Sequence, residues 1–387
     1  MSRDEAALWL NDKQKAMEEA IAPLVSINSF TDNVEGGRKV AEGLRAALHV
    51  PGLTAKTVAS TRYADHLVFA STGKKGAAPI ALVGHLDTVF PPGTFEGFRV
   101  DGDLRRGPGV LDMKGGLVVV AFAVRAVAET MGLDAVSPLR VIVVSDEEVG
   151  SPEGRGVIES SIAGASACLV FESGRKADAI ITRRKGTGMM RAVVHGRAAH
   201  AGNAHAEGRN AIWAAARFVD RVQRLTDYGR GVTINVGTIR GGQSKNTVPD
   251  RAEVALDLRF CTRADADALV DAVRRAADET IAGEPSFEGM RIDLDGGVAR
   301  VPLEKTPASA ALMEAYAACA RDSGLGASEA PLVGGGSDAS TSAAMGIASI
   351  DGLGPRGVGF HTKDEQIEVA SLVPKAQALA RFLARST

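Results

Sequence analysis

The sequence has 387 residues, more than one hydrophobic core usually accommodates, and this length predicts two domains. Apolar residues make up 45% and charged residues 24% of the chain, proportions that are typical of globular proteins in water. A formal net charge of −2 gives no polyelectrolyte signal, so we expect neither nucleic acid nor an anionic membrane as the main partner.

The N-terminal stretch "MSRDEAALWLNDKQKAMEEA" mixes acids and bases on a helical period and lacks the continuous apolar core of a secretory signal. No stretch of the sequence reaches the length of a transmembrane helix. The three cysteines, Cys168, Cys261 and Cys319, are scattered, which favours reduced core residues over a disulfide framework or a zinc knuckle. We therefore expect a cytoplasmic protein.

The first half of the chain alternates apolar segments of strand length with segments of helical period. The expected helices are residues 35–48, 115–131 and 154–162, and the expected strands are residues 78–89, 139–149 and 167–174. Because these strands are apolar and helices separate them, the pattern predicts an α/β domain with a mainly parallel sheet and helices on both faces.

The pattern changes near Arg184. Strands are expected at residues 188–196, 232–242, 252–261 and 290–296, and helices at residues 210–226 and 264–283. This β-α-β-β-α-β order is that of a ferredoxin-like α+β unit. After Gly297 the alternation of helices and strands returns. We therefore predict one α/β domain formed by residues 1–183 and 298–387, with a smaller α+β domain inserted at residues 184–297.

Residue types that bind metals follow several of the expected strands. In open α/β sheets, side chains that do chemistry gather at the carboxyl ends of the strands. His85 and Asp87 stand two residues apart and would share a face of an extended backbone, where Asp87 could accept the second ring N–H of His85. The stretches "GVLDMKGG", "SDEEVG", "CLVFESG" and "GVGFHT" supply further candidates, namely Asp112, Glu147, Glu148, Glu172 and His361.

Each of these residues also has a structural interpretation. A single histidine at a strand end is more often a hydrogen-bonded core residue, and a single acid before a helix more often caps that helix. Glu147 and Glu148 could form a solvated turn, and Gly334–Gly336 could be a flexible loop.

Taken together, the acids are harder to explain without a cation. Several carboxylates at one sheet edge would repel and raise each other's pKa unless a cation were present. Two imidazoles with three carboxylates suit Zn²⁺, and Co²⁺ and Mn²⁺ accept the same ligands. Five ligands exceed the need of one tetrahedral ion, which implies two ions about 3.5–4 Å apart.

Seven motifs resemble, in order and spacing, those of a known family: "GHLDTVF", "GPGVLDMKGG", "SDEEVGSPEGR", "FESG", "GRAAHAG", "GGGSDAS" and "GVGFHTKDE". The family is that of the co-catalytic zinc metallopeptidases, which includes glutamate carboxypeptidases, aminoacylases, acetylornithine deacetylases and succinyl-diaminopimelate desuccinylases. The resemblance extends from about Ile80 to Glu365 and is nearest to the glutamate carboxypeptidase branch. It implies a catalytic domain with two zinc ions and an inserted dimerisation or lid domain.

The resemblance also implies roles for individual residues. Asp112 would bridge the two zinc ions. His85 and Glu172 would complete one site, and Glu148 and His361 the other.

Two further residues would act beside the metal in this interpretation. Glu147 would stay off the ions as the general base, taking a proton from the attacking water and passing it to the leaving amine. Asp87 would orient His85. Because Glu147 and Glu148 are adjacent, they can take different roles only if the chain bends there.

The inserted segment contains three histidines in "HGRAAHAGNAH". We expect His195 and His205 to be surface residues. His200 matches a family histidine, and the resemblance implies that it stabilises the oxyanion in the other subunit's active site across a dimer. Asn246 and Arg259 match residues implied to bind the terminal carboxylate of the substrate, a role that suits a guanidinium group. A structural arginine on a sheet surface is the alternative.

The glycine run before Ser337 is a further candidate for substrate contact. Gly335 and Gly336 allow close backbone approach to a substrate. Ser337 and Asp338 could contact the substrate or cap the helix that follows.

The favoured hypothesis is hydrolysis of an amide bond on the amino side of a free carboxylate, in a small peptide or an N-acyl amino acid, by a homodimer with two zinc ions per subunit. One alternative is a deacylase of the acetylornithine deacetylase or succinyl-diaminopimelate desuccinylase type. Another is a non-catalytic metal-binding homologue, which would be expected to lack the base or a ligand; here all six positions are filled.

Overall fold

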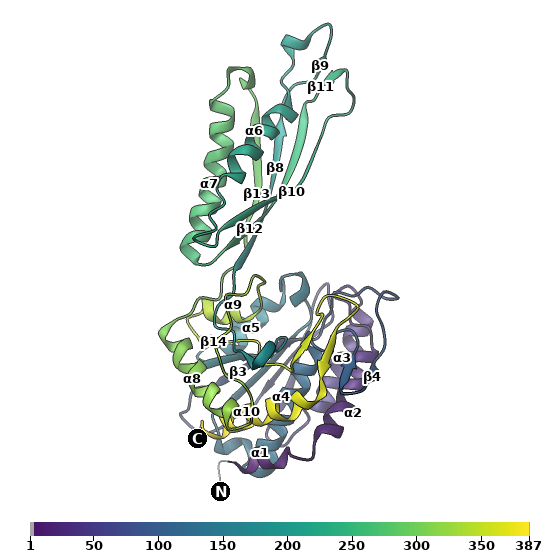
Figure 1. The fold of residues 1–387 in the computed structure, drawn as a ribbon, viewed down its shortest axis with the longest axis vertical. Coiled ribbons are helices and arrows are strands. Elements are labelled where there is room, and N and C mark those ends of the chain that lie inside the picture. Colours follow the sequence, from purple (N-terminus) through teal and green to yellow (C-terminus); the bar gives the residue numbers. More distant parts are fainter. Residues whose placement is uncertain (1–3, 387) are drawn as a thin grey trace. The chain divides into compact units, whose positions relative to one another are not determined.

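The computed structural model describes residues 4–386 as two compact units (Figure 1). Unit 1 comprises the chain up to Arg183, Lys305–Leu332 and the chain from Ser337 onward, and unit 2 comprises Arg184–Glu304 and Val333–Gly336. Each unit has its own hydrophobic core. None of the helices among residues 4–386 has both the length and the hydrophobicity needed to cross a membrane.

Unit 1 is built on a six-stranded sheet with the order β1-β2-β6-β3-β7-β14. β3 is parallel to β6 and β7, and β7 is parallel to β14, whereas β2 is antiparallel to β1 and β6. The sheet is therefore mainly parallel, as the sequence predicts. Its strands are β1 (Thr54–Val58), β2 (His66–Ala70), β3 (Ile80–His85), β6 (Leu139–Val144), β7 (Ala167–Val170) and β14 (Ala348–Ile350).

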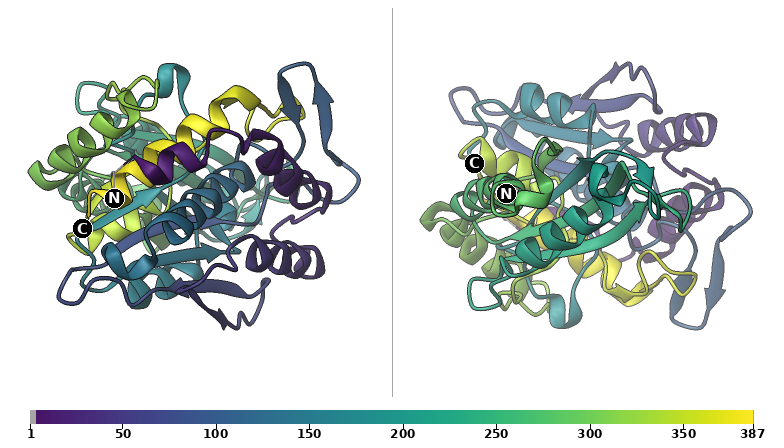
Figure 2. Two further views of the ribbon diagram at one scale, coloured as in Figure 1. Left: turned by 90° about the horizontal axis from the view of Figure 1, so that it is seen from below. Right: turned by 90° about the horizontal axis from the view of Figure 1, so that it is seen from above.

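Helices cover both faces of this sheet (Figures 1 and 2). α4 connects β3 to β6 and packs with α1, α2, α3 and α10, whereas α5 connects β6 to β7 and packs with α9. Because β6 and β7 lie on opposite sides of β3, right-handed connections place α4 and α5 on opposite faces. The helices are α1 (Glu5–Trp9), α2 (Gln14–Ser26), α3 (Val34–Ala47), α4 (Lys114–Thr130), α5 (Gly154–Ile162), α8 (Pro307–Arg321), α9 (Ala339–Ala344) and α10 (Leu372–Ala384).

The sequence of α4 shows how burial overrides local preference. Its run "LVVVAFAV" contains three consecutive valines, which favour strands over helices. Nearly every side chain of this helix is buried, so packing against the sheet and the surrounding helices stabilises it.

A second, antiparallel sheet of unit 1 has four strands in the order β15-β16-β5-β4. The loop between β5 and α4 contains Asp112, and the loop between β15 and β16 contains His361. Strands of two or three residues give no periodic signal, so the sequence did not predict this sheet. The strands are β4 (Arg99–Asp101), β5 (Leu104–Arg106), β15 (Gly357–Val358) and β16 (Gln366–Glu368).

Unit 2 has a four-stranded antiparallel sheet with the order β10-β12-β8-β13, packed on one face against α6 and α7. Alternate residues of β12 are buried, because one face of the sheet meets the helices and the other is open. Its β-α-β-β-α-β order is the ferredoxin-like order that the sequence predicts. The elements are β8 (Gly186–His195), β9 (Ala199–His200), α6 (Ala211–Gln223), β10 (Thr233–Gly241), β11 (Thr247–Val248), β12 (Arg251–Phe260), α7 (Arg263–Ala282) and β13 (Arg291–Arg300).

The limits of unit 2 differ from residues 184–297, which the sequence suggested for the insertion. The strand β13 continues to Arg300, and the unit continues to Glu304. Val333–Gly336 also belongs to unit 2, and the main-chain N–H of Lys185 donates to the carbonyl of Val333 at 2.8 Å. A pairing between segments so far apart in the chain leaves no local sequence pattern.

Candidate metal centre

Five residues of unit 1 form two groups that share one carboxylate. The first group is His85, Asp112 and Glu172, and the second is Asp112, Glu148 and His361. Within each group the potential ligand atoms lie within 4.8 Å of one another. The parallel sheet explains part of this convergence, because His85 ends β3, Glu172 follows β7 and Glu148 follows β6.

In the first group, the His85 ring lies between main chain and carboxylates. Its Nδ1 is 3.1 Å from the main-chain oxygen of Asp87 and 3.4 Å from the Asp87 carboxylate. Its Nε2 is 3.4 Å from Asp112 Oδ1 and 3.5 Å from Glu172 Oε1. Burial disfavours the charged ring, but the Glu172, Asp112 and Asp87 carboxylates together hold the pKa of His85 well above its usual range.

The Asp112 carboxylate joins the two groups. Its Oδ1 faces His85, and its Oδ2 lies 3.4 Å from Nε2 of His361. Burial opposes its ionisation, yet the His361 and His85 rings hold the pKa of Asp112 well below its usual range. Burial and the Asp112 charge raise the pKa of Glu172 well above its usual range. Ionisation of both carboxylates of the first group is therefore unfavourable unless a further positive charge lies beside them.

The second group reaches the surface through His361, whereas the side chains of Asp112 and Glu148 are mostly buried. His361 Nε2 is 3.1 Å from Glu148 Oε2, and nearly half of the His361 side chain is exposed. Hydrogen bonds to Asp112 and Glu148 outweigh burial and raise the pKa of His361 to about 10. Burial raises the pKa of Glu148.

The residues of both groups fit a divalent metal. Asp112 Oδ1 is a buried oxygen that accepts no hydrogen bond among the described residues, and buried polar atoms seldom stay unpaired. Imidazole nitrogens and carboxylate oxygens are ligands that Zn²⁺ accepts. A cation in the first group would give this oxygen a partner, and a cation in each group would neutralise the crowded carboxylates.

The two adjacent glutamates lie on a short 3₁₀ turn, Glu147–Val149, rather than on the strand. Gly150 ends this turn with a φ of 95°, in the left-handed region that favours glycine. Glu147 and Glu148 can take separate roles only if the chain bends between them and the strand, and this turn supplies that bend.

Asp87 also holds this turn, which the sequence did not predict. Its carboxylate accepts the main-chain N–H groups of Glu147 and Glu148, each at 3.2 Å, and the hydroxyl of Thr31 at 2.8 Å. The neighbouring acid Asp146 accepts the N–H groups of Glu153 and Gly154 at the start of α5. Asp146 is therefore a structural acid.

The remaining candidate residues, apart from Ser337 and Asp338, belong to unit 2. His200 lies in β9, where it is paired with Thr247 of β11, and the N–H of Ala201 donates to the carbonyl of Asn246 at 2.9 Å. His200 and Asn246 are therefore neighbours within the unit. The ring Nδ1 of His200 accepts the N–H groups of Gly202 and Asn203, each at 3.1 Å.

Arg259 and the glycine run lie elsewhere in unit 2. Two nitrogens of the Arg259 guanidinium donate to Asp257 at 2.8 and 2.9 Å. The carbonyl of Gly335 accepts a hydrogen bond from Arg184 at 3.2 Å. A Cβ atom on Gly336 would lie 2.6 Å from Cδ of Arg300, so packing alone favours glycine there.

Ser337 and Asp338 are buried in unit 1 and make internal hydrogen bonds. The Ser337 hydroxyl donates to Asp351 at 2.6 Å, and Asp338 accepts the hydroxyl of Ser151 at 2.6 Å. These contacts are structural, but the side chain of Asp338 makes no cap hydrogen bond at the start of α9, so the helix-capping role considered for it is not observed.

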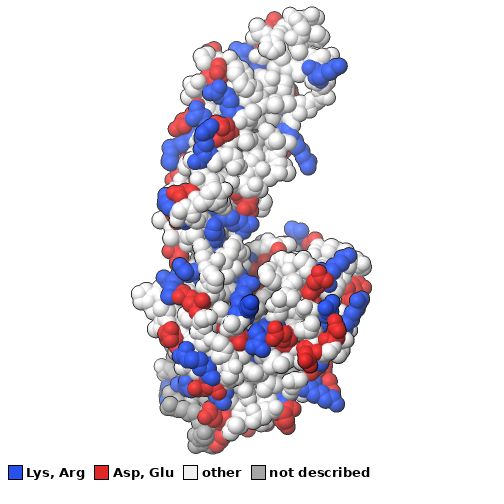
Figure 3. Space-filling view, in the orientation of Figure 1, with Lys and Arg blue, Asp and Glu red and all other residues white. Residues whose placement is uncertain are grey.

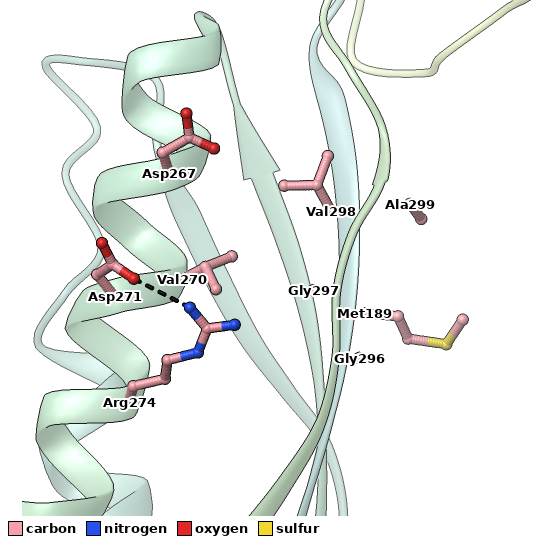
Figure 4. Close-up of a pocket in the computed structure, with 9 residues that line it drawn as sticks. All are labelled: Met189, Asp267, Val270, Asp271, Arg274, Gly296, Gly297, Val298 and Ala299. Carbon is pink, nitrogen blue, oxygen red and sulfur yellow. Dashed lines mark hydrogen bonds and ion pairs between the residues drawn. The ribbon is translucent and has the colours of Figure 1, made fainter.

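A cavity of unit 2 carries no comparable chemistry. It has a volume of about 700 Å³ and lies between α7 and β13 (Figure 4). Its charged side chains come from α7, where Arg274 and Asp271 pair at 3.1 Å. The residues that line it include no imidazole and no thiol. They are Met189, Asp267, Val270, Asp271, Arg274, Gly296, Gly297, Val298 and Ala299.

Comparisons with known proteins find similarity to a peptidase domain, a carboxypeptidase and a deacetylase. A model of the M20 peptidase dimerisation domain matches residues 182–284. Carboxypeptidase G2 of Pseudomonas sp. (strain RS-16) is 27% identical over 380 residues, which cover 96% of this chain and 89% of the relative. Acetylornithine deacetylase of Myxococcus xanthus is 27% identical over 304 residues, which cover 72% of this chain and 76% of the relative.

The fold of the whole chain matches a solved structure. The Bacillus subtilis YxeP protein, described as a dinuclear metal-binding peptidase of the M20 family, superposes with a TM-score of 0.73 at 15% identity. The match covers 97% of this chain and 98% of that one. The chain is thus related to the M20 peptidases, metallopeptidases and amidohydrolases that act on amide bonds, and its residues 182–284 match their dimerisation domain.

Proposed function

We propose that this chain hydrolyses the amide bond on the amino side of a free carboxylate, as a glutamate carboxypeptidase does, and that it needs two Zn²⁺ ions. The observation that carries the proposal is the Asp112 carboxylate, which belongs to both groups of potential ligands. The similarity to carboxypeptidase G2 over 96% of the chain supports this branch of the family.

The proposed ligands are the members of these two groups. Asp112 would serve both ions, His85 and Glu172 the first, and Glu148 and His361 the second. When bound, two such ions polarise a carbonyl and lower the pKa of an attacking water. The donor set also accepts Co²⁺ or Mn²⁺.

Glu147 is the proposed general base. Asp87 accepts the main-chain N–H of Glu147 and so holds the turn on which Glu147 lies next to Glu148. The negative charge of Glu147 also helps to raise the pKa of Glu172, although burial and the Asp112 charge have larger effects. Its carboxylate would take the proton of the attacking water and transfer it to the nitrogen of the leaving amine.

Unit 2 is the proposed source of the groups that recognise the substrate. The planar guanidinium of Arg259 suits the free carboxylate of the substrate, and Asn246 would bind the same carboxylate. His200 has its Nδ1 engaged by main-chain N–H groups, which leaves Nε2 to donate to an oxyanion. Gly335 and Gly336 would allow close approach of the substrate backbone.

We also propose that unit 2 forms a homodimer. Ile212 and Trp213 of α6 and Ile239 of β10 are exposed apolar side chains, and β10 is an edge strand of its sheet. Ile212 lies against the end of β10, because a Cβ atom on Gly241 would be 2.9 Å from its Cγ1. A second copy would cover both the apolar residues and the strand edge.

Small peptides or N-acyl amino acids fit the charge of the surface better than nucleic acid does. Acidic and basic side chains are interspersed over the visible face of each unit (Figure 3). The formal net charge is −2. Neither feature provides the basic surface on which phosphate backbones bind.

The second candidate function is that of a deacylase, which the similarity to an acetylornithine deacetylase favours. The specificity constants for N-acyl-glutamates and peptidyl-glutamates, compared with those for acetylornithine and succinyl-diaminopimelate, separate the two functions. Higher values for the glutamate compounds support the proposal, and the reverse order supports the deacylase. Activity that survives complete metal removal would contradict both.

The role of His200 across a dimer has its own experiment. Subunits that carry His200→Ala and subunits that carry Glu147→Ala are each expected to be poorly active. Mixing them should restore part of the activity, because one hybrid site then contains both intact residues. Light scattering of the same samples checks that they are dimers. Dimers without recovery would contradict a shared site.

A further inference from the structure

Glu365 is a buried acid that the sequence did not single out. It is 1% exposed and immediately precedes β16. Its Oε1 accepts the main-chain N–H groups of Leu111 at 2.8 Å and Asp112 at 3.0 Å, and its Oε2 accepts that of Gly109 at 3.1 Å. All three donors belong to the loop that carries the shared carboxylate.

This loop needs an acceptor from elsewhere. Residues 109–112 are all buried, and buried N–H groups without a partner each cost roughly 1–3 kcal/mol. Gly109 has a φ of +76°, and a Cβ atom there would lie 2.8 Å from Thr88 and 3.1 Å from the stem of Lys114. The loop is thus tightly enclosed, and the Glu365 carboxylate satisfies three of its N–H groups at once.

The same residue also belongs to the loop that carries His361. The N–H of Glu365 donates to the carbonyl of Thr362 at 3.2 Å, and the N–H of Thr362 donates to the carbonyl of Gly359 at 2.9 Å. In addition, the main-chain N–H of Gly107 donates to the carbonyl of Glu365 at 3.3 Å. Glu365 therefore connects the Asp112 loop with the His361 loop through both its main chain and its side chain.

We propose that Glu365 is a positioning residue that fixes the Asp112 carboxylate at the junction of the two ligand groups, in register with His361. This inference rests on the proposed two-metal function. Since Asp112 belongs to both groups, a displaced Asp112 weakens the binding of both metal ions. A carboxylate that only stabilised the fold would leave both affinities unchanged.

Glu365→Gln is the main test variant. Its side chain has nearly the same size, but one carboxylate oxygen becomes an NH₂ group, which must face a main-chain N–H donor. Glu365→Asp keeps the carboxylate but has a shorter side chain, so its metal affinity should lie between those of Glu365→Gln and the wild type. Asp178→Asn is the matched control, because Asp178 is another buried acid of unit 1 and pairs with Arg356 and Lys375.

The experiment titrates the full-length, metal-free proteins with Co²⁺ and records the visible spectrum and the dissociation constant of each ion. Wild type should bind two equivalents. In Glu365→Gln, both constants should rise by roughly 10- to 100-fold, as for other partners of metal ligands, and the Co²⁺ spectrum should change. Asp178→Asn should lower the Tm and leave the constants and the spectrum unchanged.

Two results would overturn the inference. Wild-type constants and a wild-type spectrum in both Glu365 variants, with a lowered Tm as in Asp178→Asn, would mean that Glu365 only stabilises the fold, while the proposed function would stand. Failure of the wild-type protein to bind Co²⁺ would overturn the proposed function and this inference together.

Discussion

The carboxylate of Asp87 accepts the main-chain N–H of Glu147 at 3.2 Å. The main-chain oxygen of Asp87 lies 3.1 Å from Nδ1 of His85. One buried residue therefore orients a candidate metal ligand and the turn that carries the candidate base. The orientation of a ligand and that of the base are coupled at this position.

Asp87→Asn should lower kcat by roughly 10- to 100-fold with a smaller effect on KM, because the new NH₂ group faces the N–H donors of the turn. Steady-state kinetics on an N-acyl-glutamate measure both constants. Asp134→Asn is the control, since Asp134 makes an exposed hydrogen bond with Thr72. Wild-type kcat in Asp87→Asn would contradict the role of Asp87.

Glu147→Gln and Glu148→Gln should separate the base from the ligand. Glu147→Gln should keep both metal equivalents and lose about 10²- to 10⁴-fold in kcat, because it removes only the proton acceptor. Glu148→Gln should weaken one metal equivalent, since its oxygen lies 3.1 Å from His361 within the second group. Metal content and turnover of the two variants check this, and loss of metal in Glu147→Gln would refute the assignment.

Metal uptake should depend on pH through His361, whose pKa is raised to about 10. The metal-free protein then carries a proton on this ring at neutral pH, and a metal ion must displace it. The apparent affinity for the ion held by Asp112, Glu148 and His361 should therefore rise with pH, by up to about tenfold per pH unit between about pH 6 and 8. Calorimetry in buffers of different ionisation enthalpy measures the released proton.

The same group sets a stability trend in the metal-free protein. Because the folded-state pKa of His361 lies above the value near 6.5 of an unfolded histidine, its contribution is fully present below about pH 6.5. That contribution is lost as the pH rises through about 10. His361→Ala should remove both the trend and the proton release; an unchanged release would show that another group titrates.

Arg259→Met should raise KM by roughly 10- to 100-fold, because it removes a charge-assisted hydrogen bond to the carboxylate of the substrate. The variant should also no longer distinguish a substrate with a free carboxylate from its amide. Arg191→Met is the matched control, since Arg191 pairs with Glu253 in the same sheet of unit 2. Equal effects of the two substitutions would argue that Arg259 is only a surface arginine.

The large elements and the candidate ligands could be predicted from the sequence, because each leaves a local signal. Apolar strands followed by acids indicate the ends of parallel strands, as at β6 and Glu148. The ferredoxin-like order of unit 2 follows in the same way from periodicity. The resemblance to the metallopeptidase family and the fold class are both confirmed by the comparisons.

The supporting contacts could not be predicted, because they depend on tertiary packing. Along the sequence, Glu365 is 253 residues from Asp112, whose main-chain N–H it accepts. Asp87 reaches Glu147 across 60 residues. The sheet from β4 to β15 consists of strands too short for a periodic pattern, although it carries both of the loops that Glu365 connects.

Zinc stoichiometry tests most directly whether Asp112 serves two ions in amide hydrolysis. The metal-free protein is titrated with Zn²⁺ while bound metal and hydrolysis of an N-acyl-glutamate are measured together. Activity should reach its plateau at two equivalents per chain, and Asp112→Asn should weaken both binding events. Full hydrolysis by the metal-free protein, or wild-type uptake of two ions by Asp112→Asn, would contradict this mechanism.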